Sequence, residues 1–83
     1  MKNVFYFTAE WCGPCKKTRP IVEEMKKEGF EFQIIDADYE QLLVKRFGIK
    51  SVPTFILFEN EKEIDRTTGA KTRKELQSFI NGK

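Results

Sequence analysis

The only two cysteines of the chain, Cys12 and Cys15, stand three residues apart in the segment EWCGPCKK. Thiols at this spacing can form a small disulfide ring and reopen it, contribute to a metal site, or make a structural disulfide. A zinc site needs four ligands, and without histidine in the sequence it would need carboxylates or a second chain. A structural disulfide across so short a loop stabilises a fold only weakly. The pair therefore favours reversible thiol–disulfide exchange.

The residues around the cysteines indicate how such a pair becomes reactive. The pattern places Cys12 just before a helix, where unpaired N–H groups and the positive end of the helix dipole favour a thiolate. Pro14 fits the first helical turn, because its missing N–H costs nothing there, and it restrains the loop between the sulfurs. An inert role in the core is a remaining alternative for Cys15, because its side of the helix points inward. A C-x-x-C motif near a β-α-β unit in a cytosolic protein nevertheless indicates redox work.

The bulk composition suits one small domain, which we expect to span residues 1–83. Apolar residues make up 40% of the chain and eight residues are Phe, which is enough for a thin core. Charged residues make up 34%, yet they nearly balance at a net charge of +2. Because no basic stripe with interleaved aromatic residues is present, we expect no nucleic-acid binding.

The N-terminal segment MKNVFYFTA does not have the pattern of a signal peptide. Its apolar run is too short, and no small-residue cleavage pattern follows it. No segment of the chain approaches the length of a transmembrane helix. We therefore expect a cytoplasmic protein without a membrane partner, in a compartment where a purely structural disulfide would be out of place.

Four short segments have the apolar patterns of strands. Residues 4–7 (VFYF) and 55–58 (FILF) are continuous apolar runs, which are typical of strands buried on both faces. Residues 30–36 (FEFQIID) alternate between apolar and polar, and residues 62–67 (KEIDRT) contain one apolar side chain. These two patterns are typical of edge strands. Two central strands flanked by two edges predict a four-stranded sheet.

Three helices are expected at residues 14–28, at 38–47 and from Thr72 onward. Helical spacing predicts their apolar faces, which are Cys15, Thr18, Val22 and Met25 in the first, Tyr39, Leu42, Leu43 and Phe47 in the second, and Leu76, Phe79 and Ile80 in the third. Capping boxes are expected at Asp38 with Gln41 and at Thr72 with Glu75, and C-terminal stops at Gly29 and Gly48.

The predicted elements follow the order β-α-β-α-β-β-α, which is an α/β fold. The first β-α-β unit should be parallel and right-handed. The short ENEK link at residues 59–62 implies an antiparallel hairpin, although it lacks the favoured Asn-Gly pair. With the apolar strands at the centre, the spatial order is 2-1-3-4 in a mixed sheet that has helices on both faces.

Several of these segments together resemble the thioredoxin family. The matching segments are WCGPC at residues 11–15, Lys16, Pro20, FGIKSVPTFILF at 47–58 and TTGA at 67–70. The resemblance covers the chain from Asn3 onward and lacks the strand and helix that ordinary thioredoxins carry before this point. It implies a minimal thioredoxin fold, the size of a glutaredoxin, with no bound cofactor and no metal.

The resemblance implies a role for each matching residue. Cys12 is the expected nucleophile, Cys15 the resolving cysteine, and Pro53 a cis-proline beside them. Exposure of Cys12 and partial burial of Cys15 would assign the two cysteine roles independently of the resemblance. The expected docking surface for a substrate segment consists of Trp11, Gly13, Pro14, Val52, Gly69 and Ala70. Each of two residues also has a purely structural explanation. Trp11 would then be a half-exposed packing residue, and Pro53 a proline at the start of a strand.

Four positions depart from the family pattern. Tyr6 replaces a buried carboxylate and Ile34 replaces its partner lysine, the groups thought to help deprotonate the second cysteine. An unperturbed phenol keeps its proton to about pH 10, so Tyr6 is a poor base. Thr8 and Thr68 stand where bulkier apolar residues are usual. We therefore expect slower exchange or a simpler pH profile, and a smaller or more polar docking surface.

Three functions stay open at this point. The first is a monomeric protein-disulfide reductase that is recharged by a thioredoxin reductase and supplies electrons to targets such as ribonucleotide reductase. The second is a glutaredoxin-like protein recharged by glutathione. The carboxylates of glutathione could bind four cations, Lys16, Lys50, Lys71 and Arg73. The third is a binding subunit with a thioredoxin fold, against which the intact cysteine pair argues.

Overall fold

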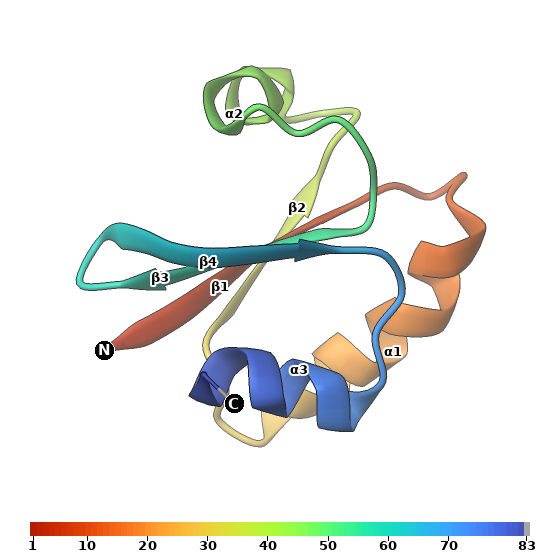
Figure 1. Cartoon of the computed structure of the whole chain (residues 1–83). Helices are drawn as coiled ribbons and strands as arrows, with labels where there is room; N and C mark the ends of the chain where they lie inside the picture. The colour runs from red at the N-terminus through yellow and green to blue at the C-terminus, as the bar shows by residue number, and fades with distance from the viewer. Residues whose placement is uncertain (83) are drawn as a thin grey trace.

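A computed structural model of the protein describes residues 1–82, which form four strands and three helices (Figure 1). The elements in chain order are β1 (Lys2–Thr8), α1 (Gly13–Lys27), β2 (Phe32–Asp36), α2 (Gln41–Phe47), β3 (Thr54–Glu59), β4 (Lys62–Thr68) and α3 (Arg73–Asn81). This is the predicted order of elements. None of the three helices is long and apolar enough to cross a membrane.

The sheet has the predicted strand order, β2-β1-β3-β4. Strand β1 pairs parallel with β2 and antiparallel with β3, and β3 pairs antiparallel with β4. The central strands are the two continuous apolar runs, and all of their side chains except the half-buried Phe5 are buried, because other strands flank them and helices cover both faces. Strand β2 is shorter than predicted, because it begins at Phe32 and not at residue 30. Strand β4 is longer, because it ends at Thr68 and not at residue 67.

The β3–β4 hairpin turns through Asn60 and Glu61, which both have positive φ, at 53° and 69°. Two successive left-handed residues match the right-handed twist of the flanking strands. The hairpin therefore forms without the Asn-Gly pair, with Glu61 in a conformation that glycine adopts more readily. A register shift between Leu57 and Phe58 makes an irregularity beside this edge of the sheet.

Two apolar layers lie on opposite faces of the sheet (Figure 1). Helices α1 and α3 cover one face, and α2 covers the other. The first layer contains Val4, Tyr6, Val22, Met25, Phe32, Phe55, Leu57, Leu76 and Ile80, and the second contains Phe7, Ile35, Ile56 and Phe58. Alternation along β1 sends Tyr6 into the first layer and Phe7 into the second. The prediction of helices on both faces is confirmed.

Helices α1 and α3 have the predicted faces and ends. All four predicted inward residues of α1 are buried. Gly29 follows the last turn of α1 with φ at 109°, and Thr72 with Glu75 forms a reciprocal capping box at the start of α3. Local side-chain chemistry therefore sets where these two helices begin and end.

Helix α2 is shorter than predicted and faces the sheet differently. It begins at Gln41, and the Asp38 side chain does not cap it. Instead, the Asp38 N–H donates to the Asp36 carboxylate, and the Gln41 side-chain amide donates to the Asp38 carbonyl. Tyr39 and Leu42, predicted to face inward, are 83% and 85% exposed. The residues that pack on the second layer are Leu43, Val44 and Phe47. In so short a helix, the connections to β2 and β3 decide which residues meet the sheet.

Candidate active site

The cysteine pair lies where β1 ends and α1 begins. Cys12 is the N-cap residue of α1, with extended backbone, and its Sγ accepts the backbone N–H of Cys15 at 3.2 Å. The two Sγ atoms are joined in a disulfide, and the Cα atoms are 5.2 Å apart. One sulfur therefore occupies the place that a serine or aspartate side chain takes at other helix N-termini, where N–H groups favour negative charge.

The loop before β3 forms the opposite wall of the site. Cys12 Sγ lies 3.5 Å from the carbonyl oxygen of Val52, and the Val52–Pro53 peptide bond is cis, as the resemblance implied. The Pro53 carbonyl accepts the N–H of Gly69 at 2.9 Å, which places the end of β4 beside the same loop. Segments that are 40 residues apart along the chain thus meet at one sulfur.

Exposure does not separate the two cysteines as expected. Cys12 is 3% exposed and Cys15 is 1% exposed, because Ala9 and Val52 pack against the disulfide. Exposure in the oxidised form therefore does not assign the two cysteine roles. Neighbouring Trp11, at 70% exposed, and the exposed Gly13 and Pro14 surround the buried pair with accessible surface.

Asp38 is a site residue that the sequence reasoning missed. The indole N–H of Trp11 donates to its carboxylate at 2.9 Å, which orients the exposed ring beside the disulfide. The contact arises because the carboxyl ends of parallel strands β1 and β2 lie at the same edge of the sheet. The signal in the sequence is an aspartate two residues after β2, which the capping prediction instead placed at the start of a helix.

Tyr6 lies behind the second cysteine, in the position of the family's acid. It is fully buried, stacks on Phe55 with ring centroids 4.8 Å apart, and donates its hydroxyl to the Cys15 carbonyl at 3.4 Å. Burial raises the pKa of Tyr6, although a hydrogen bond from Thr8 acts in the opposite direction. Ile34 packs at the margin of the same apolar layer. A neutral hydrogen-bond donor therefore lies beside Cys15, where the resemblance implied a carboxylate.

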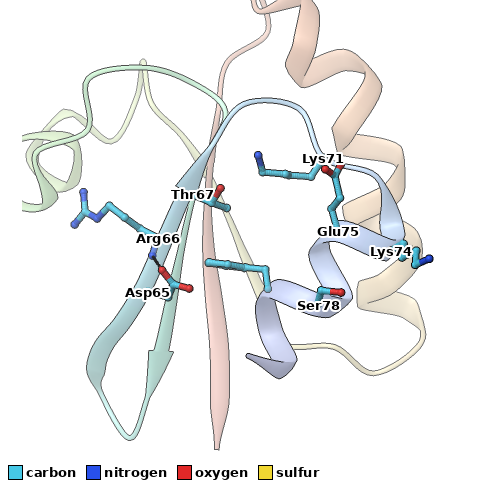
Figure 2. Close-up of a pocket in the computed structure, with 8 residues that line it drawn as sticks. Asp65, Arg66, Thr67, Lys71, Lys74, Glu75 and Ser78 are labelled. Atoms are coloured by element: carbon cyan, nitrogen blue, oxygen red, sulfur yellow. Dashed lines mark hydrogen bonds between the residues drawn. The ribbon is translucent and has the colours of Figure 1, made fainter. Parts of the chain in front are cut away.

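A hollow of about 560 Å³ lies between β4 and α3, away from the cysteines (Figure 2). Most of its charged groups are already bound to neighbours. Lys71 donates to the Thr68 carbonyl, Arg66 binds Glu63 and the Phe47 carbonyl, and Glu75 belongs to the cap of α3. Figure 2 shows Lys74 pointing away from β4. The hollow therefore lacks a free set of groups for a ligand.

Within residues 1–82, no three histidine, cysteine, aspartate or glutamate side chains are grouped closely enough to hold a metal ion. Cys12 and Cys15 have only each other as sulfur partners. The arrangement in this part of the chain therefore fits dithiol–disulfide exchange better than metal binding.

Comparisons with known proteins give a consistent result. The sequence model of the thioredoxin family matches residues 1–82. Thioredoxin of Chlamydia caviae is 39% identical over 77 residues, which cover 90% of this chain and 76% of that protein. Thioredoxin of Bacillus subtilis is 35% identical over 78 residues, covering 90% and 75%. The structure of Fasciola hepatica thioredoxin superposes with a TM-score of 0.89 at 34% identity, covering 98% of this chain and 79% of the other.

Proposed function

The chain belongs to the thioredoxin family and is a thiol–disulfide oxidoreductase that reduces protein disulfides, and we propose that Cys12 is its nucleophile and Cys15 its resolving cysteine. The observation that carries this assignment is the N–H of Cys15 directed at Cys12 Sγ. A sulfur that accepts a backbone N–H at a helix N-terminus is stabilised as a thiolate, which is the attacking form.

The reaction then proceeds in two exchanges. The Cys12 thiolate attacks one sulfur of the substrate disulfide, the substrate S–S bond breaks, and its electron pair leaves on a substrate thiolate that takes up a proton. The Cys15 thiolate next attacks Cys12 Sγ, which forms the Cys12–Cys15 bond and releases the second substrate thiolate. The Cα separation of 5.2 Å lies within the range for a disulfide, which supports closure of the ring with little backbone movement.

The docking surface that we propose surrounds the disulfide on three sides. Trp11, Gly13 and Pro14 form one exposed side, Val52 a second, and Gly69 with Ala70 a third. The backbone on either side of the cis peptide would pair with an extended substrate segment by strand addition. The hydrogen bond from Gly69 to Pro53 supports a fixed spacing between the second and third sides.

A thioredoxin reductase is the electron donor that we propose, in preference to glutathione. Two of the four cations considered for glutathione are bound elsewhere, since Lys71 donates to the Thr68 carbonyl and Arg73 pairs with Glu28. Glu28 caps the far end of α1, which at 1.5 Å per residue is roughly 20 Å from Cys12. Of the four cations, Lys16 and Lys50 remain for the carboxylates of glutathione.

The cellular setting that we propose is the cytoplasm, where the protein would act as a monomer on disulfide-containing proteins such as ribonucleotide reductase. The reduced thiol pool of that compartment supports a protein whose two thiols cycle. A binding role without redox chemistry would leave the arrangement of Cys12 at the helix N-terminus without use.

Insulin reduction at neutral pH tests the proposal, with NADPH and thioredoxin reductase, glutathione and glutathione reductase, or dithiothreitol as electron source. We expect turnover with dithiothreitol and thioredoxin reductase and little with glutathione. The Cys12→Ser variant should lose activity, and Cys15→Ser should accumulate a mixed disulfide. Efficient turnover with glutathione would instead favour the glutaredoxin-like role, and no acceleration over dithiothreitol alone would favour the binding subunit.

A further inference from the structure

A small open hollow lies against the second cysteine. It has a volume of about 200 Å³ and is lined by Thr8, Ala9, Glu10, Cys15, Lys16 and Arg19. A water molecule occupies roughly 30 Å³ in the liquid, so several can enter. Cys15 is otherwise almost completely buried, at 1% exposed. Because Cys15 is one of the lining residues, water in the hollow lies next to it.

The threonine at the end of β1 helps to form this hollow. Thr8 is buried and faces the same side of the strand as Tyr6, two residues nearer to the cysteines. A bulkier side chain at this position would occupy the space. Thr8, which leaves space for the hollow, and Tyr6, which stands where the resemblance implied an acid, thus lie on the same side of β1.

The charged side chains around Cys15 favour its thiolate. Lys16 and Arg19 contribute two positive charges to the wall of the hollow, and Glu10 contributes one negative charge. Arg19 is also paired with Glu23 at 3.3 Å on the exposed side of α1. The remaining titratable group near Cys15 is Tyr6, which faces it from β1 and stays neutral. The four charges sum to zero once Glu23 is counted. Lys16 directly follows Cys15 and Arg19 lies about one turn further along α1, whereas Glu23 lies about two turns away, so the nearer cations favour the Cys15 thiolate.

Tyr6 is unsuited to accept the proton. Its hydroxyl donates to the Cys15 carbonyl, and burial raises its pKa, so the phenol remains protonated at neutral pH. The group that the family pattern makes a base is here a hydrogen-bond donor to the backbone. Proton removal from Cys15 must follow another path.

We propose that Cys15 loses its proton to water in the hollow beside Thr8, with Lys16 and Arg19 stabilising the thiolate and Glu10 opposing them. The proton passes to bulk solvent, and the thiolate electron pair forms the bond to Cys12 while the bond from Cys12 to the substrate sulfur breaks. The substrate thiolate that leaves takes up a proton from water. This route rests on the proposed function, since it assumes that Cys15 is the resolving cysteine.

The test follows the two exchanges separately, by stopped flow with the reduced protein and an excess of dithiodipyridine. This neutral disulfide releases one absorbing thione when Cys12 attacks and a second when Cys15 resolves the mixed disulfide. The rate of the first phase depends on reagent concentration and the rate of the second does not. The second phase is recorded as a function of pH.

The surface charges provide variants that preserve the fold. Lys16→Gln and Arg19→Gln should each slow the second phase about twofold to threefold below the midpoint of its pH profile, the size expected for one charge acting largely through water. Glu10→Gln should accelerate it by a similar factor. Lys26→Gln makes the same charge change about three turns further along α1 and should have no effect. Thr8→Leu, checked for folding by circular dichroism, should slow the second phase by filling the hollow.

The Tyr6→Phe variant distinguishes the two routes. It should leave the pH profile of the second phase in place, because the phenol takes no part in proton transfer. A profile moved by Tyr6→Phe and unchanged by the variants at Glu10, Lys16 and Arg19 would overturn the proposed route. Rapid release of one thione by Cys12→Ser, with only slow release by Cys15→Ser, would instead overturn the proposed roles of the cysteines.

Discussion

Replacement of Tyr6 by phenylalanine provides a sharp test of how the core supports the cysteines. Phenylalanine keeps the ring that stacks on Phe55 at an interplanar angle of 10° and removes only the hydroxyl. That hydroxyl donates to the Cys15 carbonyl at 3.4 Å, a long distance for an O–H···O bond. The substitution therefore separates the packing of the ring from the polar contacts of its hydroxyl.

The expected loss of stability is modest. A weak hydrogen bond contributes at the low end of about 0.5–1.5 kcal/mol, and the Cys15 carbonyl lies within α1, where the N–H four residues on is its helical partner. We therefore expect Tyr6→Phe to lower the free energy of unfolding by about 0.5–1 kcal/mol. Tyr6→Ala removes the whole ring from a fully buried position and should cost about 3–5 kcal/mol.

The difference in the free energy of unfolding between wild type and Tyr6→Phe should depend on pH. Burial raises the pKa of Tyr6 in the folded state above its unfolded value, which is about 10. Below that pH both states keep the proton and the wild type retains its full advantage. Above it the unfolded chain ionises first, so the wild type loses stability that Tyr6→Phe does not lose.

Urea denaturation of the oxidised proteins at pH 7 and at alkaline pH measures these differences. Tyr39→Phe is the matched control, because it removes an exposed hydroxyl and should change stability little. A Tyr6→Phe variant as unstable as Tyr6→Ala would show that the hydroxyl, and not the ring, supports this region. A constant difference from pH 7 to above pH 10 would contradict the role of burial.

Five further substitutions test the local structure by urea denaturation. Thr72→Ala removes the side chain that caps α3 and should cost about 1 kcal/mol, whereas an unchanged midpoint would contradict a stabilising role for the capping box. Glu61→Gly should stabilise the protein by about 0.5 kcal/mol, because relief of the left-handed conformation slightly exceeds the added entropy of the unfolded chain. The control Glu59→Gly, within β3, should destabilise the protein. Leu42→Ser should change stability by less than about 0.5 kcal/mol, and Leu43→Ser should cost about 1–2 kcal/mol. Equal effects of the two leucine substitutions would contradict the orientation of α2.

The sequence by itself determined the order of elements and the position of the cysteine pair. The central strands are continuous apolar runs, which only a sheet covered on both faces can bury. The cap of α3 and the helix start at Cys12 depend on side chains within three or four residues of each other. Such short-range patterns act before the chain has folded, so they can be read directly from neighbouring residues.

The tertiary structure decided what depends on segments distant along the chain. Asp38 meets Trp11 across 27 residues, and Val52 meets Cys12 across 40. The burial of Cys12 follows from packing by Val52 and was not predicted from its place in a loop. The inward face of α2 likewise follows from how its connections dock it on the sheet. These contacts form only when the strands pair, because β1 brings the ends of β2 and β3 to its two sides.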